Sequence, residues 1–548
     1  MKYLLSLLLL CSGLAARADF IFDQFIAKAQ SLPYEELRGL PLLNNGRIKP
    51  LESLAKETSI YLTGSYQFKG LHPIQLLLGL MISDDGENLQ LIEVRSPELR
   101  KQLGLPTPES RRHYSLKELM SANLESLASA LMEKQKVNKR SLTEVENKTI
   151  ETYEQTWMFQ QARNGALLLG AMEPAQAATD PAQTPQSSAV VDEFKLLMQA
   201  LSTKDSVEYQ KHAAELKQKL NAQNWPEPVR AQLSNIDREL FYQQYKPFRW
   251  ACWIFFLFAF LMVFPKSNEW VFKTVPKTIS ATLLFIPLIF LALGFYIRVS
   301  ITGFAPVTNM YGTMIWVALG VGFFGWIFYL IYRNGVFLAL TYFGAFCLLL
   351  ITEQMPLVIS PDMDPIVAVL RSNFWLTIHV LTITISYAAF SIAMLLGNTM
   401  IIRDLLKRNN VEWIKTYGHF CYRTIQLGVF LLSIGIILGG VWADYSWGRF
   451  WGWDPKETWA LIADLGFLIL LHARLVGWVD LYRLLLLAPL SYLLVIMAWY
   501  GVNFILATGL HSYGFSSGGA QIVTVFVSVQ LLLIFGSFFT RMLRAKKV

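Results

Sequence analysis

Hydrophobic residues are distributed unevenly along this chain of 548 residues. From Phe248 to the C-terminus, long apolar runs alternate with short polar loops. Each of nine runs approaches the roughly 20 residues that a helix needs to cross a bilayer. They cover residues 248–264, 279–297, 311–332, 336–354, 374–402, 421–441, 460–478, 484–503 and 520–540. The pattern predicts that residues 247–548 form a helical membrane domain with about nine spans.

The first half of the chain has a different pattern. Residues 19–246 are polar, carry many lysines and glutamates, and contain no apolar run long enough to span a membrane. Helix-compatible stretches cover residues 116–170 and 190–219, and a third begins near Pro228. An Ala/Pro/Gln-rich linker is predicted at 173–189. We expect a mainly helical domain outside the membrane, and an all-α fold for the chain as a whole.

The orientation of the chain is predicted by two independent features. Residues 1–18 combine Lys2, a short apolar run and Ala16-Arg17-Ala18, which is typical of a cleavable secretory signal. The loop charges fit a secreted N-terminus, because basic loops stay on the cytoplasmic side. The basic residues predicted on that side are Lys266, Lys273, Lys277, Arg333, Arg403, Lys407, Arg408, Lys415, Arg474, Arg483, Arg541, Arg544, Lys546 and Lys547.

Composition excludes several classes of function. The chain is 53% hydrophobic and carries a net charge of +8. Because this positive charge collects in short loops, where it sets topology, nucleic acid is not an expected partner. No Cys-x-x-Cys pair occurs among the four cysteines. The chain is therefore predicted to be neither a thiol–disulfide carrier nor a protein with its own covalent haem-attachment site.

Five tryptophans gather in the polar segment between two apolar runs: Trp442, Trp447, Trp451, Trp453 and Trp459. Membrane proteins usually place one or two tryptophans at each interface as anchors. This larger group favours a platform for a large planar ligand. The same segment contains Asp454-Pro455 and Glu457, a signal for the start of a helix, so a purely capping role for both acidic residues stays open.

The segment WGRFWGWDPKETWALI (447–462) resembles the tryptophan-rich "WWD" signature of haem-handling proteins in cytochrome c maturation. Within that group the chain is most similar to the CcsA (ResC) branch. The similarity extends to FWLTIHV around His379, LLHARL around His472, GVNFILATGLHSYGF around His511, and APVTNMYG (305–312). In the family this last stretch usually continues with Glu-Ser, whereas Gly312 and Thr313 stand here. NNGRIKPLESLAKET (44–58) resembles a motif of fused CcsB–CcsA chains; a turn followed by a helix is the alternative interpretation.

The resemblance implies a haem b site at the outer membrane face. His379 and His511 would hold the iron from opposite sides, because neutral imidazole is the usual axial ligand of haem. The tryptophan segment would cover the porphyrin, while Arg449 and Lys456 would pair with the propionates unless they are simply solvated.

His472 lies about 20 Å deeper by helical rise, so it cannot reach that haem. In the family the matching histidine belongs to an inner haem site that a histidine of CcsB completes. This ligand would come here from a CcsB (ResB)-like partner subunit. Asp464, on the same helix, would orient a polar group or pair with Arg298 or another basic residue. The remaining histidines are predicted to be structural or solvated: His72, His113, His212 and His419.

The function that the resemblance implies is that of a cytochrome c synthase (haem lyase) subunit in the bacterial inner membrane. The first domain and the tryptophan segment would lie on the periplasmic side. Haem would be presented to the Cys-x-x-Cys-His segment of apocytochrome c, with thiol-reducing proteins as indirect partners and membrane lipid around the spans. Three alternatives stay open: haem delivery of the CcmC type, a b-type electron-transfer subunit, and an ion-coupled transporter.

Overall fold

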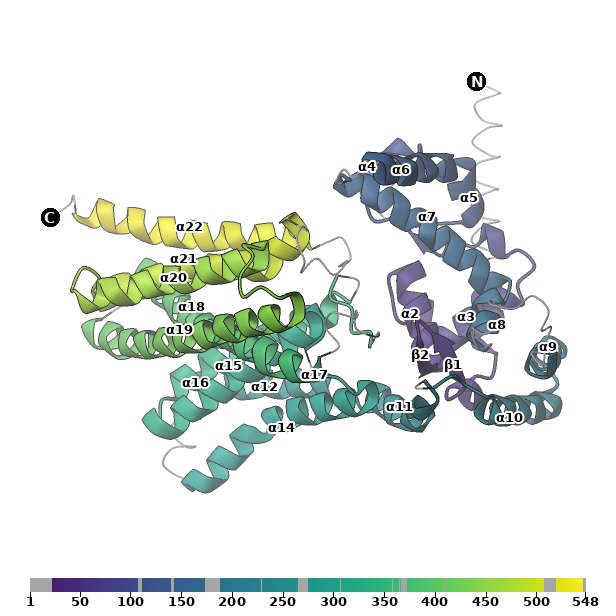
Figure 1. Cartoon of the computed structure of the whole chain (residues 1–548), viewed down its shortest axis with the longest axis horizontal. Helices are drawn as coiled ribbons and strands as arrows, with labels where there is room; N and C mark the ends of the chain where they lie inside the picture. Colours follow the sequence, from purple (N-terminus) through teal and green to yellow (C-terminus); the bar gives the residue numbers. More distant parts are fainter. Residues whose placement is uncertain are drawn as a thin grey trace. The chain divides into compact units, whose positions relative to one another are not determined.

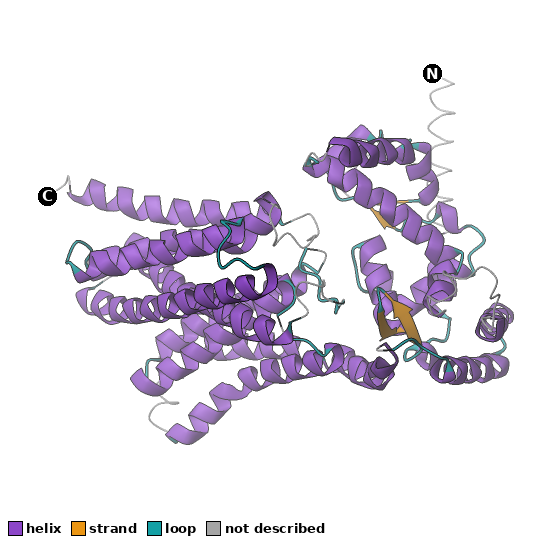
Figure 2. Ribbon diagram, in the orientation of Figure 1, coloured by secondary structure: helices purple, strands orange, loops and turns teal. Residues whose placement is uncertain are grey.

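We analysed a computed structural model of the chain. It describes residues 22–106, 111–138, 142–172, 188–227, 229–264, 275–305, 307–356, 358–363, 365, 372–408, 410–506 and 519–545. The predicted signal segment, most of the predicted linker and His511 lie outside these residues. The chain divides into two compact units, Met1–Gln244 and Tyr245–Val548 (Figure 1). Helices dominate both units, and the strands of the described residues all belong to the first (Figure 2).

The first unit begins with a helix over residues 22–30. Its short helices and strands are η1 (Glu35–Leu37), β1 (Pro41–Asn44), β2 (Arg47–Pro50), η2 (Phe68–Gly70), η3 (Gly86–Asn88), β3 (Ile92–Glu93), β4 (His113–Tyr114) and η5 (Val229–Asn235). Its α-helices are α2 (Leu51–Thr63), α3 (Pro73–Met81), α4 (Pro97–Gln102), α5 (Leu116–Ser121), α6 (Leu124–Asn138), α7 (Glu144–Arg163), α8 (Ala166–Met172), α9 (Ser188–Thr203), α10 (Ser206–Ala222) and α11 (Ile236–Tyr245). The long helical stretch predicted at 116–170 is broken, because Asn123 and Gly165 adopt positive φ.

The segment 44–58 forms a hairpin turn and then a helix. Strands β1 and β2 pair antiparallel from Pro41↔Pro50 to Asn44↔Arg47, and Asn45 and Gly46 make the two-residue turn with φ of 51° and 74°. Asn-Gly is the preferred pair for such a turn, since both positions require positive φ. Helix α2 follows directly, so the turn-then-helix interpretation is confirmed.

A buried ion pair ties this hairpin to α11. Arg47 donates from Nη1 to Glu239 Oε2 at 2.5 Å and from Nη2 to Oε1 at 3.1 Å, with side chains only 6% and 2% exposed. Ser53 Oγ donates to the same carboxylate at 2.5 Å. The two-pronged geometry suits guanidinium and carboxylate. Residues almost 200 positions apart are thereby held together.

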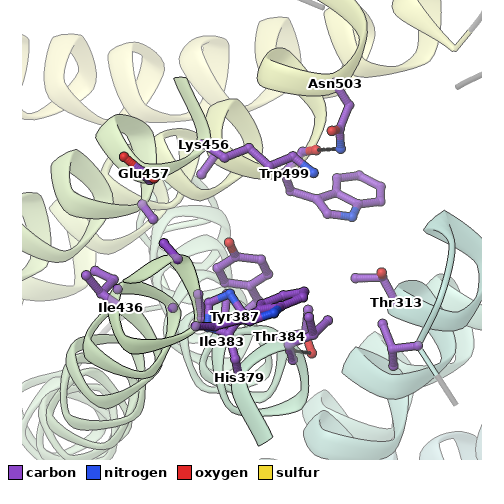
Figure 3. A pocket seen from close by; sticks show the side chains of 18 of the residues that line it. Thr313, His379, Ile383, Thr384, Tyr387, Ile436, Lys456, Glu457, Trp499 and Asn503 are labelled. Atoms are coloured by element: carbon purple, nitrogen blue, oxygen red, sulfur yellow. Dashed lines mark hydrogen bonds between the residues drawn. The ribbon is translucent and has the colours of Figure 1, made fainter. Parts of the chain in front are cut away.

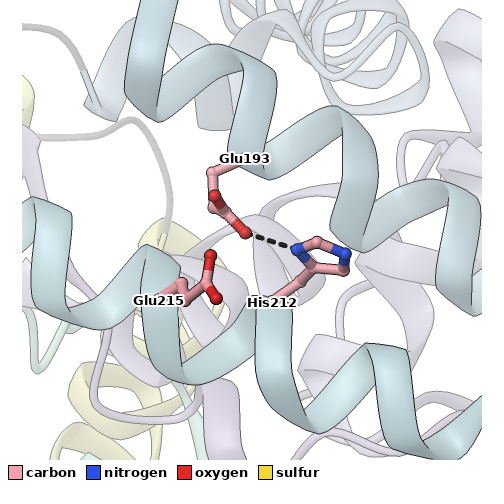
Figure 4. Close-up of side chains that lie close together, drawn as sticks. All are labelled: Glu193, His212 and Glu215. Carbon is pink, nitrogen blue, oxygen red and sulfur yellow. Dashed lines mark hydrogen bonds and ion pairs between the residues drawn. The ribbon is translucent and has the colours of Figure 1, made fainter.

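Helices α9 and α10 are joined by a second cluster of charged side chains (Figure 4). Glu193, His212 and Glu215 bring potential metal-ligating atoms within 4.8 Å of one another. His212 Nδ1 lies 2.5 Å from Glu193 Oε1, and Lys219 donates to the same carboxylate. Burial raises the pKa of the Glu193 carboxyl, but the hydrogen bonds from Lys219 and His212 outweigh this effect and hold the pKa below its ordinary value. Since Lys219 already compensates the buried charge, we interpret the cluster as an ion-pair link between helices.

The second unit consists of helices. They are α12 (Pro247–Val263), α14 (Lys277–Thr302), α15 (Met310–Tyr332), α16 (Gly335–Gln354), α17 (Asn373–Trp375), the π-helical η7 (Leu376–Val380), α18 (Leu381–Leu405), α19 (Val411–Trp447), α20 (Pro455–Leu475), α21 (Leu481–Ile496), the π-helical η8 (Met497–Leu506) and α22 (Ala520–Ala545). Across the described residues, nine continuous helical stretches are long and apolar enough to span a membrane. The predicted multi-pass, all-α architecture is confirmed.

The main difference from the predicted boundaries concerns the tryptophan segment. Helix α19 runs for 37 residues and ends only at Gly448, whose φ of 68° suits a helix C-cap. Trp442 and Trp447 are therefore helical, and the connecting loop is confined to residues 448–454. Hydropathy marks the apolar part of a helix and misses this polar extension beyond it.

The Arg47–Glu239 pair yields a stability prediction. We expect Arg47→Ala to lower the local unfolding free energy of the β1–β2 hairpin by about 3–5 kcal/mol, because it leaves the Glu239 carboxylate buried without its counterion. Hydrogen–deuterium exchange of peptides covering the hairpin in the full chain measures this. Lys211→Ala is the matched control: Lys211 pairs with Glu208 at the surface, where such pairs contribute less than about 1 kcal/mol. Equal exchange in both variants would refute the prediction.

Candidate functional site

A pocket lies among the helices of the second unit (Figure 3). Its walls come from α15, η7, α18, α19, α20, η8 and the loop 448–454, and it holds about 1230 Å³ of space not filled by atoms, part of it open to the outside. The lining residues that matter most are Thr313, His379, Tyr387, Trp442, Trp447, Phe450, Trp451, Lys456, Trp499 and Asn503. We call it the haem pocket below, after the ligand that the sequence resemblance implies.

His379 lines this pocket from the π-helical segment η7. Its Nδ1 lies 2.8 Å from the carbonyl oxygen of Gly435 on α19. A carbonyl only accepts, so Nδ1 carries the proton in this contact and the lone pair of the neutral ring lies on Nε2. Such a hydrogen bond on the other nitrogen is the usual way in which a metal-binding imidazole is oriented. The Trp442 ring packs edge-on against the imidazole, at 5.7 Å between centroids.

Glycines of α19 make room for these rings. A Cβ atom at Gly439 would lie 2.5 Å from Cε1 of His379, and one at Gly440 would lie 2.5 Å from the Phe450 ring. Gly435 is packed equally tightly against Ile383 of α18. Small residues of this kind let membrane helices approach closely. They bring His379 and the aromatic loop to the same side of α19.

Among the residues that the structure describes, three indole N–H groups around the haem pocket have no hydrogen-bond partner. They belong to Trp442, Trp451 and Trp499, and each nitrogen is buried. The side-chain oxygen of Asn503 is likewise unpaired. Buried donors without an acceptor cost about 1–3 kcal/mol each, so they indicate a ligand with acceptor oxygens. The two carboxylates of a haem fit this requirement, and the Lys456 side chain in the same wall would supply positive charge.

The loop 448–454 is held by the start of α20. Asp454 and Glu457 form a capping box, with Pro455 in the first turn. Glu457 Oε2 accepts from the backbone N–H groups of Gly452 at 2.8 Å and Asp454 at 3.2 Å. Arg449 lies 3.6 Å from Glu457 and over the Trp447 ring. The predicted helix start is confirmed, and Asp454 acts as a cap in this structure.

Trp453 and Trp459 are not among the residues that line the haem pocket. Trp453 is 71% exposed and has a φ of 55°. A left-handed conformation costs a bulky residue about 1–2 kcal/mol. It persists because the N–H groups on both sides, those of Gly452 and Asp454, bond to one carboxylate oxygen of Glu457. The strain holds a large aromatic ring outward, edge-on to Trp451.

Sequence comparisons identify relatives for this half of the chain. The sequence model of the family described as "Cytochrome C assembly protein" matches residues 307–511. The cytochrome c biogenesis protein CcsA of Guillardia theta is 35% identical over 240 residues, which cover 39% of this chain and 78% of that protein. CcsA of Prochlorococcus marinus (strain MIT 9312) is 31% identical over 318 residues, covering 52% of this chain and 99% of that protein.

The chain belongs to the CcsA family. Its role is therefore in cytochrome c maturation. It also matches protein NrfI of Wolinella succinogenes at 36% identity over 226 residues, covering 40% of this chain but only 24% of NrfI. The family match includes His379, the tryptophan segment, His472 and His511, and ends at His511.

The second candidate histidine of this CcsA-family chain lies apart from the haem pocket. His472 is in the last turn of α20, is exposed, and donates from Nδ1 to the carbonyl oxygen of Leu468 at 2.8 Å. Its Nε2 therefore carries the lone pair, as in His379. Ile469, one turn earlier on α20, is 69% exposed. His472 thus belongs to an apolar lateral face of the unit.

The pairing of Asp464 with Arg298 is wrong. Asp464 accepts from Ser433 Oγ of α19 at 2.7 Å, whereas Arg298 donates to the backbone carbonyls of Pro361 and Asp362. Ser433 lies on the neighbouring helix α19, whereas Arg298 bonds to the segment that follows α16.

Sequence patterns missed the contribution of η8 to this CcsA-family site. Trp499 and Asn503 reach the haem pocket from a ten-residue π-helical segment, in which Asn503 Nδ2 donates to the carbonyl oxygen of Trp499 at 2.6 Å. π-helical turns occur frequently at functional sites. The family-like stretch from Gly501 to Phe515 was the available signal, since it contains Asn503 as well as His511. No signal in the sequence marked Tyr387 and Thr313, because their apolar runs look like ordinary membrane helices.

The unpaired indoles yield a prediction. We expect Trp442→Phe and Trp499→Phe to weaken haem retention about 10- to 100-fold each, since a hydrogen bond to a charged group contributes about 1.5–3 kcal/mol. Haem titration of the purified full chain, followed by absorption, measures this. Trp326→Phe is the matched control, because its indole N–H already bonds to the Ala281 carbonyl oxygen, away from the haem pocket. Wild-type retention in both pocket variants would show that the indoles do not bind haem.

Proposed function

We propose that this chain is the haem-presenting subunit of a cytochrome c synthase. Haem b would lie in the haem pocket with His379 Nε2 as one axial ligand and His511 as the other. The observation that carries the proposal is the combination, in one pocket, of an imidazole oriented through its Nδ1 and three indole donors that lack acceptors. The first group suits iron and the second suits propionates.

Haem attachment would require this chain to position the haem and the apocytochrome. It would not require a side chain of this chain to act as a nucleophile. Each thiol of an apocytochrome Cys-x-x-Cys-His segment adds across one haem vinyl group: the S–H and π bonds break, and a C–S and a C–H bond form. The addition is redox-neutral and releases no leaving group. The apocytochrome histidine would replace one axial ligand. Residues of this chain would orient the porphyrin and exclude water around it, while the haem supplies the reactive groups.

The exposed Trp453 would receive the apocytochrome segment. It lies two residues after Trp451 of the haem pocket wall and packs edge-on against that indole, while 71% of its surface stays exposed and its backbone has a positive φ. An exposed aromatic ring held rigidly beside a reaction site suits recognition of a peptide, because tryptophans are frequent anchors in interfaces. The peptide would then lie at the rim of the haem pocket, within reach of the vinyl groups.

The lateral face around His472 would bind a partner subunit. Ionisable side chains on a lipid-facing surface are unfavourable and usually mark functional sites. A histidine from a CcsB-like subunit would complete an inner haem site with His472 Nε2. Together with the basic loops and the N-terminal signal, this proposal places His379 and the tryptophan segment on the periplasmic side of a bacterial inner membrane.

The experiment that tests this function is the visible spectrum of the purified full chain, alone and coexpressed with a CcsB-like partner. We expect a bis-imidazole haem spectrum that His379→Ala and His511→Ala abolish. The loss of haem affinity should exceed the roughly 10- to 100-fold that is typical when a residue supporting a metal ligand is changed. Added imidazole should restore the spectrum of His379→Ala by filling the vacated position. His472→Ala should remove only the haem that depends on the partner.

His419→Ala is the control, since His419 is exposed and lies outside the haem pocket. Attachment of haem to a coexpressed apocytochrome is measured in the same strains. Haem binding without any attachment would favour a delivery protein instead. Absence of haem with every partner would refute the proposal.

Trp453→Gly tests the docking role separately. Glycine accepts positive φ, so the loop and the haem spectrum should stay unchanged. The apocytochrome concentration for half-maximal attachment should rise at least about tenfold, because anchor aromatics contribute about 2 kcal/mol or more. Trp478→Gly, at an equally exposed tryptophan in the loop after α20, should behave as wild type. A spectral change in Trp453→Gly would assign Trp453 to the haem instead.

A further inference from the structure

A second cavity lies directly beside the haem pocket. It is formed by α15, α16, α18, α21, η8 and α22 and holds about 1290 Å³ of space not filled by atoms, part of it open to the outside. Four residues line both spaces: Met310, Thr313, Tyr387 and Trp499. The two cavities therefore share a wall, and the Trp499 ring is part of it.

The chemistry of this cavity differs from that of the haem pocket. No histidine and no charged residue is among the residues that line it. Its few hydroxyl groups bond locally: Ser391 Oγ and Tyr492 OH lie 2.9 Å apart, and Ser391 also donates to the carbonyl oxygen of Tyr387. The remaining walls are aliphatic, aromatic or sulfur-containing, with Met314, Cys347 and Phe526 as examples. The cavity thus offers no imidazole for iron and few partners for water.

An empty space of this kind is unfavourable. Protein interiors are packed as densely as organic crystals, and voids larger than a water molecule are few. Apolar cavities do not attract water, because each water needs two to four polar partners. Around the membrane-spanning helices the available medium is hydrocarbon. A chain from that medium would fill the cavity and regain the missing dispersion contacts without desolvating any polar group.

We propose that this cavity is a binding site for one hydrocarbon chain of a membrane lipid. The bound chain packs behind Trp499 and Tyr387 and fixes the rings that face the haem pocket. Trp499 belongs to the π-helical η8 and lines both spaces, so a ligand in the cavity contacts the same residue that faces the haem pocket. The lipid is then a structural component of the haem pocket wall. The lipid site is inferred from the cavity alone and does not depend on the proposed synthase function.

Photolabelling of the full chain in lipid nanodiscs tests the site. A palmitic acid carrying a terminal diazirine should give adducts on cavity-lining peptides of α16 and α22, and excess oleic acid should suppress them at least about tenfold, as for specific binding. Adducts on the outward face of α14, where Leu283 is 48% exposed, should not be suppressed by oleic acid. Adducts that are equal on both faces and insensitive to oleic acid would overturn the proposal.

Filling the cavity gives an independent check. Cys347→Trp places a large ring on the cavity wall and should abolish the oleate-sensitive adducts; Cys347→Phe does the same with less bulk if the first variant folds poorly. Leu283→Trp is the matched control on the lipid-facing surface and should retain them. Persistence of the oleate-sensitive adducts in both Cys347 variants would refute this location.

Haem retention measures whether the bound lipid chain supports the wall of the haem pocket. Washing with a short-chain detergent should release haem from wild type, and vesicles of phosphatidylethanolamine and phosphatidylglycerol should restore binding. If the lipid is verified to be lost and haem retention is unchanged, the supporting role of the bound hydrocarbon chain is overturned. The photolabelling needs no haem, so a failure of the synthase proposal would leave its result interpretable.

Discussion

The close approach of η7 and α18 to α19 is the constraint on which the haem pocket depends. The carbonyl of Gly435 accepts from His379 Nδ1 at 2.8 Å, and a Cβ atom at Gly435 would lie 2.5 Å from Ile383 Cγ1 and 3.1 Å from its backbone nitrogen. Any side chain there would separate the helices and release the imidazole. The helix contact thus determines both the position of His379 and the nitrogen that it presents.

Around this contact the site leaves polar groups unpaired, which a membrane domain does at a cost. The indoles of Trp442, Trp451 and Trp499 have no acceptors, and Trp453 is held in a strained conformation by Glu457. The unpaired indoles and the strained Trp453 lie in the wall and at the rim of the same pocket. Binding of a charged planar ligand and of a peptide there would offset both energetic costs. Elsewhere in this unit, the indole N–H of Trp326 donates to the backbone carbonyl oxygen of Ala281.

The two sides of the haem pocket have complementary chemistry. One side presents nitrogen ligands and N–H donors, and the other is backed by an apolar cavity with Trp499 as the shared partition. His472 lies on a different surface, among exposed apolar residues of α20. His379 and His472 therefore belong to two separate places in the unit, a pocket lined by several helices and an exposed position on one of them.

The sequence by itself determined the nine spans, the capping box at Asp454 and the family, because hydropathy, capping and motif are local properties of consecutive residues. It also placed His379, Trp442 and Lys456 among the candidates. Only the tertiary structure decided that Trp453 faces outward, that α19 continues through Trp447, and that Trp499 and Asn503 join the site. These outcomes depend on glycine contacts, π-helical turns and hydrogen bonds between distant segments. No short stretch of sequence encodes them, since each requires a partner on another helix.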